Sequence, residues 1–174
     1  MKLMDVLKLS HQIIQDTGAP HALIGAFGMS AHGYQRATND IDYLVDGDFR
    51  PQIESEFKKK GFRLFNSSDD VIQFEGPGSV DIIFARRPMS KEMLGRNNLT
   101  SILEIPVLAA EDIIGLKIQA LTNEPRRKFK ELGDIQALCQ IKKLVDWDRI
   151  QKYAELFNAW DIISEIKNGI ARDN

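Results

Sequence analysis

The spacing of apolar residues changes at Pro106, and this change constrains the fold more than any other feature of the sequence. Before Pro106, short apolar runs with the alternation typical of β-strands are separated by turn residues and by helix-periodic segments. After Pro106, apolar residues recur at the spacing typical of amphipathic helices. We therefore predict an α+β (mixed α/β) fold in two regions: a core with a mixed sheet over residues 1–105, and a helical region over residues 106–174 packed on that core.

Turn residues set the boundaries of the expected elements. Thr17-Gly18-Ala19-Pro20 ends a first helix, and Gly61 ends a later one. The sequence predicts helices at 5–16, from 28 onward, and at 49–60, 111–121, 128–143, 147–157 and 161–170. It predicts strands at 22–26, 40–45, 62–65, 71–74 and 80–84.

Length, charge and cysteine content narrow the class of protein: 174 residues are enough for a sizeable buried core. The formal net charge of -2 gives no bulk positive field that would attract nucleic acid to the whole surface. The single cysteine, Cys139, excludes a disulfide framework and a multi-cysteine zinc site. The N-terminal segment lacks the apolar core of a signal peptide, and no uncharged apolar run reaches the roughly 20 residues of a membrane helix. These features predict a soluble, cytoplasmic protein that spans no membrane.

Asp40 and Asp42 lie in a segment that alternates as a strand does. Side chains two positions apart on a strand share a face and are about 6.6 Å apart along it, so both carboxylates can reach one cation or two neighbouring cations. A third carboxylate, Asp81, interrupts an otherwise apolar strand, where an unpaired charge is costly. If the two strands are neighbours, the three carboxylates converge on a site suited to Mg²⁺, which prefers oxygen ligands. The alternatives are a solvated strand start for the first two aspartates and an edge-strand or strand-start position for Asp81.

A segment of small residues, Ile24-Gly25-Ala26-Phe27-Gly28, follows a predicted strand and opens a predicted helix. Small residues let the backbone approach an anion, and a helix N-terminus offers unpaired amides. The segment is not a P-loop, because no Gly-Lys-Ser/Thr follows it, and it does not match a dinucleotide-binding fingerprint. By itself it is also consistent with an ordinary turn.

The spacing of these motifs resembles a known signature. Gly25-Ala26 is followed by thirteen residues and then by Asp40-Ile41-Asp42, with Asp81 on a later strand. This order resembles the polymerase-beta-like nucleotidyltransferase superfamily, in which a pair of small residues, a spacer, an Asp-hydrophobic-Asp motif and a third carboxylate occur in the same sequence.

Further motifs resemble one branch of that superfamily. His32-Gly33 and the pair Arg36 and Thr38 precede the aspartates. These motifs, together with segments 105–117 and 126–135, are similar to the small bacterial branch that includes abortive-infection (type IV) toxins. The resemblance covers residues 23–138.

The resemblance implies a magnesium-dependent nucleotidyltransferase with a mixed sheet flanked by helices and followed by C-terminal helices. In the implied reaction, an acceptor hydroxyl attacks the α-phosphorus of a nucleoside triphosphate, and pyrophosphate leaves. The implied metal ligands and catalytic residues are Asp40, Asp42 and Asp81, the last of which would complete a second metal site or act as a base. The implied nucleotide-binding residues are Gly25, Ala26, Arg36, Thr38 and Lys117.

Several of these residues also have a purely structural interpretation. Lys117 follows an apolar helix face, from which a lysine commonly extends into solvent. Arg36 is equally compatible with a surface position, and Asp134 is a candidate ion-pair partner for either cation. We interpret His32 as a hydrogen-bonding residue of the loop rather than as a base.

The sequence leaves the acceptor open. The toxin branch implies RNA or a protein hydroxyl as the acceptor and an antitoxin as a partner, whereas other members of the superfamily modify aminoglycoside or lincosamide antibiotics. Ala26 stands where the superfamily usually has Gly or Ser, so a nucleotide-binding module without catalytic activity is a further alternative. A homodimer that completes the site between chains is also compatible with the sequence.

Overall fold

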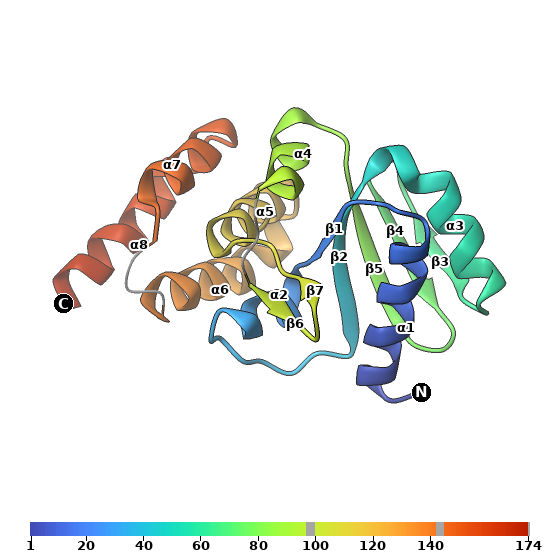
Figure 1. The fold of residues 1–174 in the computed structure, drawn as a ribbon. Coiled ribbons are helices and arrows are strands. Elements are labelled where there is room, and N and C mark those ends of the chain that lie inside the picture. The colour runs from blue at the N-terminus through green and yellow to red at the C-terminus, as the bar shows by residue number, and fades with distance from the viewer. Residues whose placement is uncertain (97–99, 142–144, 174) are drawn as a thin grey trace. The chain divides into compact units, whose positions relative to one another are not determined.

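The computed structural model describes residues 1–96, 100–141 and 145–173 (Figure 1). The chain forms two compact units. The first unit comprises Met1–Ala31 and Gln35–Leu108, and the second comprises His32–Tyr34 and Ala109–Asn174. None of the helices that the structure describes is long and apolar enough to cross a membrane.

A five-stranded sheet organises the first unit, with the strand order β1-β2-β5-β4-β3. The strands are β1 (His21–Leu23), β2 (Asp40–Asp46), β3 (Arg63–Ser67), β4 (Val71–Glu75) and β5 (Ser79–Ala85). β2 and β5 pair in parallel, and the other neighbours pair antiparallel. The sheet is therefore mixed, as the sequence predicts.

Helices α1 (Leu3–Asp16) and α3 (Arg50–Lys59) cover one face of this sheet (Figure 1). The hydroxyl groups of Ser10 on α1 and Tyr43 on β2 lie 3.0 Å apart. Phe57 of α3 stacks on Phe74 of β4 with ring centroids 4.5 Å apart. Residues that alternate with Tyr43 and Phe74 consequently point to the opposite face, where polar side chains can gather.

Smaller elements complete the first unit. They are α2 (Gly25–Ala31), the 3-10 turn η1 (Gly47–Phe49), α4 (Pro88–Gly95) and a two-stranded hairpin of β6 (Ser101–Ile102) and β7 (Ile105–Pro106). The sequence does not predict α4 or this hairpin, because segments so short show too little periodicity.

The beginning of α2 corrects one sequence prediction. The predicted strand at 22–26 is too long, since β1 ends at Leu23 and α2 begins at Gly25. The amide of Ile24 still donates to the carbonyl of Asp42 at 3.0 Å. Gly25 then adopts a φ of 56°, a left-handed conformation that ends the extended chain.

The second unit is helical in the residues that the structure describes. Its elements are α5 (Ala110–Asn123), η2 (Pro125–Arg127), α6 (Lys128–Ile141), α7 (Trp147–Leu156) and α8 (Trp160–Asp173). Residues 142 and 143 of the predicted helix 128–143 lie outside the described residues. The mixed sheet and the helical second unit confirm the predicted α+β class.

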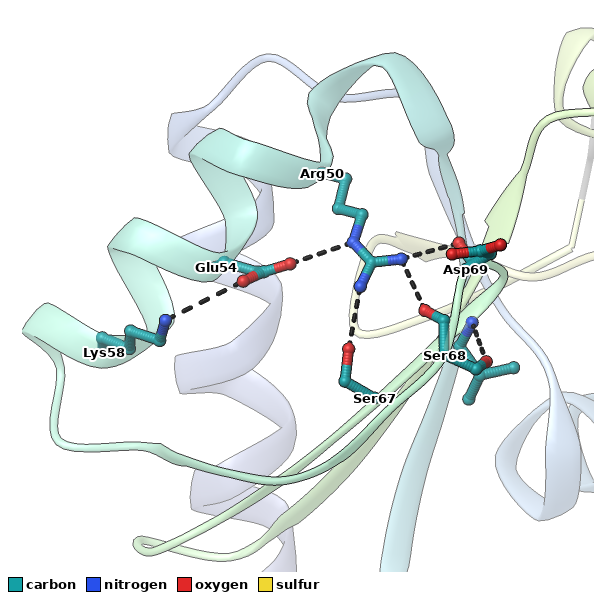
Figure 2. Close-up of polar contacts among 7 residues, drawn as sticks. Arg50, Glu54, Lys58, Ser67, Ser68 and Asp69 are labelled. Atoms are coloured by element: carbon teal, nitrogen blue, oxygen red, sulfur yellow. Dashed lines mark hydrogen bonds and ion pairs between the residues drawn. The ribbon is translucent and has the colours of Figure 1, made fainter.

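Arg50 ties helix α3 to the turn between β3 and β4 (Figure 2). Its Nε donates to Glu54 at 2.9 Å, and one terminal nitrogen donates to the carbonyls of Ser68 and Asp69, each at 2.6 Å. The other terminal nitrogen donates to Oγ of Ser67 at 2.8 Å. This arginine therefore fixes the end of the β3–β4 hairpin, whose strands carry side chains on the polar face of the sheet.

Candidate active site

Asp40, Asp42 and Asp81 meet on the face of the sheet opposite α1 and α3. The first two lie on β2, and Asp81 lies on β5, where the parallel register places it directly beside Asp42. Carboxylate oxygens from the three residues all lie within 4.8 Å of one another. All three side chains are partly exposed, so the cluster is accessible from solvent.

The alternation of buried residues explains this placement. Ile41 and Tyr43 on β2, and Val80 and Ile82 on β5, are fully buried. Because successive side chains on a strand point to opposite faces, burying these four residues turns the neighbouring aspartates away from the helix-covered side. The apolar core therefore positions the carboxylates.

The donor set of this cluster fits a hard divalent cation. Three carboxylates held this closely repel one another, and a divalent cation between them would remove the repulsion. Oxygen ligands together with room for water match the coordination of Mg²⁺. Asp40, Asp42 and Asp81 are the residues that would hold such an ion.

Two neighbouring side chains fix the orientation of two of these carboxylates, those of Asp40 and Asp81. The hydroxyl of Thr38 donates a short hydrogen bond to Oδ1 of Asp40. Nε2 of Gln73, on β4, donates to Oδ2 of Asp81 at 2.8 Å. Gln73 belongs to no sequence motif; its one signal is that it is a polar residue between two apolar residues of its strand.

Gly25 lies against the cluster. A Cβ built at this position would overlap the carboxylate of Asp42, and the φ of 56° also disfavours any other residue. The close approach that the sequence predicts for this glycine is therefore an approach to Asp42. The adjacent Ala26 is only 2% exposed as a whole residue, so it is packed inward.

Arg36 and Thr38 lie in the connection between α2 and β2. The side chain of Arg36 is partly exposed, as is that of Thr38. His32 precedes them, belongs to the second unit and is also partly exposed. The contact of Thr38 with Asp40 gives this residue a direct link to the carboxylates.

Lys117 lies on α5 in the second unit and is only 8% exposed, so it does not extend into solvent. Its Nζ donates to Glu131 at 2.8 Å and to Asp134 at 2.6 Å. Arg127 also pairs with Glu131, at 2.7 Å. Burial alone would raise the pKa of Glu131, but attraction to Lys117 and Arg127 and their hydrogen bonds lowers that pKa below its ordinary value.

A pocket of about 210 Å³ opens beside two of the aspartates. Its lining includes Asp40, Asp81, Asn39, Phe65, Gln73 and Glu75. Among the residues that the structure describes, no lysine or arginine lines this pocket. The carboxylates therefore border an acidic hollow in which a second molecule could bind.

Comparisons with known proteins identify the fold. No protein-family model matches the chain, and no curated protein matches it. Among solved structures, ANT(2″)-Ia in complex with adenylyl-2″-tobramycin is 16% identical, with a TM-score of 0.65 over 89% of this chain and 96% of that chain. The lincomycin-bound lincosamide antibiotic adenylyltransferase LnuA is 17% identical, with a TM-score of 0.51 over 80% of this chain and 96% of that chain.

A third similar structure is an antigenic nucleotidyltransferase-like protein from Paracoccidioides brasiliensis. It is 15% identical, with a TM-score of 0.55 over 96% of this chain and 91% of that chain. The resemblance to the narrower abortive-infection branch stays a prediction. The structure and these similarities together confirm that the chain has the nucleotidyltransferase fold.

Proposed function

We propose that this protein is a magnesium-dependent nucleotidyltransferase that moves a nucleoside monophosphate from a nucleoside triphosphate to an acceptor hydroxyl. The observation that carries the proposal is the convergence of Asp40, Asp42 and Asp81 on one face of the sheet. This reaction needs a divalent cation to neutralise the negative charge of the triphosphate and of the leaving pyrophosphate. Three carboxylates within 4.8 Å of one another, on a nucleotidyltransferase fold, can hold such a cation.

The residues divide the chemistry between them. Asp40, Asp42 and Asp81 would hold the metal, which when bound supplies charge neutralisation on the triphosphate and on the departing pyrophosphate. The acceptor oxygen forms a bond to the α-phosphorus while the bond from that phosphorus to pyrophosphate breaks. Asp81 accepts the proton of the acceptor hydroxyl, for which its position at the pocket is suited.

On the nucleotide side, the resemblance assigns binding to Gly25, Ala26, Arg36, Thr38 and Lys117. The contacts of two of them refine the proposal. Thr38 donates to Asp40, so we assign it the orientation of that carboxylate rather than a phosphate contact. The side chain of Ala26 has no hydrogen-bonding group and the residue is buried, so its backbone amide is the one donor that it could offer to a phosphate.

The acidic pocket favours a neutral or cationic small molecule as the acceptor. Glu75 adds a carboxylate to the pocket beyond the metal-binding cluster, and the exposed ring of Phe65 offers an apolar surface. A phosphodiester backbone would meet no lysine or arginine among the described lining residues. A hydroxylated antibiotic, the kind of compound bound in two of the similar structures, therefore fits better than RNA.

Transfer of label from α-³²P-labelled nucleotides tests this function. The full chain is incubated with Mg²⁺ and, in parallel, with an aminoglycoside, a lincosamide, bulk tRNA or no added acceptor. We expect magnesium-dependent transfer to a small acceptor that Asp40→Asn and Asp42→Asn both abolish. Equal transfer by the wild type and these variants would overturn the proposal.

Two further outcomes distinguish the alternatives. Labelling of tRNA or of the protein itself would support the toxin-like acceptors and contradict the small-molecule acceptor. Calorimetry that detects nucleotide binding without any transfer would indicate a binding module. An antitoxin partner and a homodimer stay predictions of the sequence.

A further inference from the structure

We propose that Asn66 and Gln73 are positioning residues that hold the carboxylate of Asp81 for the reaction. This inference rests on the proposed function, because it assigns residues that act through a catalytic group. Neither amide is part of the motifs that suggested a nucleotidyltransferase, and Asn66 lies on the exposed edge strand β3.

The strand register places four polar side chains in one row. Asn66 pairs with Gln73 between β3 and β4, and Gln73 pairs with Asp81 between β4 and β5. Asp81 in turn pairs with Asp42 between β5 and β2. Because directly opposed residues on neighbouring strands share a face, the row runs along the polar face from the sheet edge to the carboxylates.

Hydrogen bonds run along this row in one direction. The backbone amide of Ser67 donates to Oδ1 of Asn66 at 2.9 Å. Nδ2 of Asn66 donates to Oε1 of Gln73 at 3.1 Å, and Nε2 of Gln73 donates to Oδ2 of Asp81 at 2.8 Å. We call this series the amide relay.

The first donor sets the orientation of both amides. A backbone N–H can only donate, so the oxygen of the Asn66 amide faces Ser67 and its NH₂ group faces Gln73. The oxygen of the Gln73 amide is then occupied, and its NH₂ group faces Asp81. The relay therefore presents a donor, and not a carbonyl oxygen, to the carboxylate.

A β-bulge at Phe65 makes this alignment possible. Leu64 pairs with Phe74, but the next pair is Asn66 with Gln73, so Phe65 is an extra residue in β3. In a regular strand Phe65 would stand opposite Gln73, and Asn66 would point to the other face. Bulges commonly redirect side chains next to active sites, and this bulge brings Asn66 into the row.

The beginning of the relay is itself anchored. Arg50 donates to Oγ of Ser67 at 2.8 Å and to the carbonyl of Ser68 at 2.6 Å (Figure 2). Its guanidinium group lies against the end of the hairpin that carries Asn66. Helix α3 thus restrains the edge strand from which the relay starts.

Two substitutions test the relay. Asn66→Ala removes the donor to Gln73 at an exposed position that does not line the pocket. Gln73→Met keeps a side chain of similar length without the amide. We expect each variant to lower kcat about tenfold, and to raise the Mg²⁺ concentration needed for half the maximal rate, with little change in the KM for nucleotide.

Because Asn66 acts only through Gln73, the double variant should be no slower than Gln73→Met alone. Additive losses would overturn the relay. Arg63→Ala, at an exposed position on the same edge strand, is the matched control and should keep wild-type kinetics.

Asn66→Asp gives a sharper test of direction. The new carboxylate cannot donate, so the Gln73 amide would turn and present its oxygen to Asp81. We expect a larger loss of kcat than with Asn66→Ala, although an added negative charge would by itself attract Mg²⁺. A rate equal to or above that of Asn66→Ala would contradict the relay.

Calorimetric titration of the full chain with Mn²⁺ separates this inference from the proposed function. If no acceptor is labelled but Asn66→Ala binds Mn²⁺ several-fold more weakly than Arg63→Ala, the relay stands and the proposed function fails. If the wild type transfers nucleotide and Asn66→Ala matches it in rate and in Mn²⁺ affinity, the proposed function stands and the relay fails. Thermal denaturation should give similar Tm values for Asn66→Ala and Arg63→Ala, which excludes unfolding as the cause.

Discussion

Asp42 and Asp81 are direct partners in the parallel pairing of β2 and β5. They are 39 positions apart in the chain, yet their carboxylates and that of Asp40 lie within 4.8 Å of one another. The residues before and after each aspartate along its strand are buried, so both carboxylates must point to the opposite face of the sheet. The parallel pairing therefore brings two like charges together, and a bound cation would remove their repulsion.

Gly25→Ala should disrupt the metal site. The new methyl group would overlap the carboxylate of Asp42, and the left-handed φ would add about 1–2 kcal/mol of strain. We expect lower Tm and loss of Mn²⁺ binding by calorimetry. Gly18→Ala is the matched control, since Gly18 also has a left-handed φ but a Cβ there would meet nothing within 4 Å. The control should lose stability and keep metal binding; metal loss in both variants would refute the role assigned to Gly25.

Arg50→Ala should loosen the hairpin of β3 and β4. It removes a largely buried side chain and its hydrogen bonds to Ser67, Ser68 and Asp69. We expect a loss of about 1–3 kcal/mol in the free energy of unfolding, measured by urea denaturation. Lys58→Ala, which removes only an exposed ion pair to Glu54 at 3.8 Å, should cost little. Equal stability of the two variants would show that the hairpin does not need Arg50.

Lys117→Met should destabilise the second unit. It leaves the buried carboxylates of Glu131 and Asp134 without their shared cation, which typically costs about 3–5 kcal/mol. Chemical denaturation measures this loss, and the exposed Lys128→Met serves as control. If the variant keeps wild-type stability but no longer binds nucleotide, the main role of Lys117 is to bind phosphate and not to stabilise the second unit.

The stability of the first unit should fall as the pH drops below neutrality because of His11 and His21. Nδ1 of His11 and Nε2 of His21 lie 2.9 Å apart. Burial lowers the pKa of both residues below 6.5, and for His21 the charge of His11 adds to this effect while a hydrogen bond to the Ala19 carbonyl opposes it. As the pH falls, the histidines therefore take up protons in the unfolded chain at a higher pH than in the folded protein. The contribution of the neutral histidines to the free energy of unfolding is complete above about pH 6.5 and is lost as the pH falls through their folded pKa values.

Thermal denaturation between about pH 8 and about pH 5 checks this dependence. His21→Gln should show a flatter change of Tm over that range, because one of the two shifted groups is gone. A wild-type Tm that does not decrease over the range would contradict the assignment.

The sequence by itself determined the local features of this protein. Alternation placed Asp40 and Asp42 on one face of a strand, and the spacing of apolar residues separated a mixed sheet from the later helices, because these periodicities depend only on neighbouring residues. Only the tertiary structure decided which strands are neighbours, and hence that Asp81 stands beside Asp42.

The register of the strands, and the choice among candidate ion-pair partners, were also decided by the tertiary structure. The extra residue at Phe65 aligns Asn66 with Gln73, although periodicity gives no sign of a bulge. The sequence offers Asp134 as an ion-pair partner of either Lys117 or Arg36, and the structure confirms the pair with Lys117 and adds Glu131, which the sequence does not indicate. Strand pairing, bulges and buried ion pairs arise from contacts between distant segments, whose energies no local pattern records.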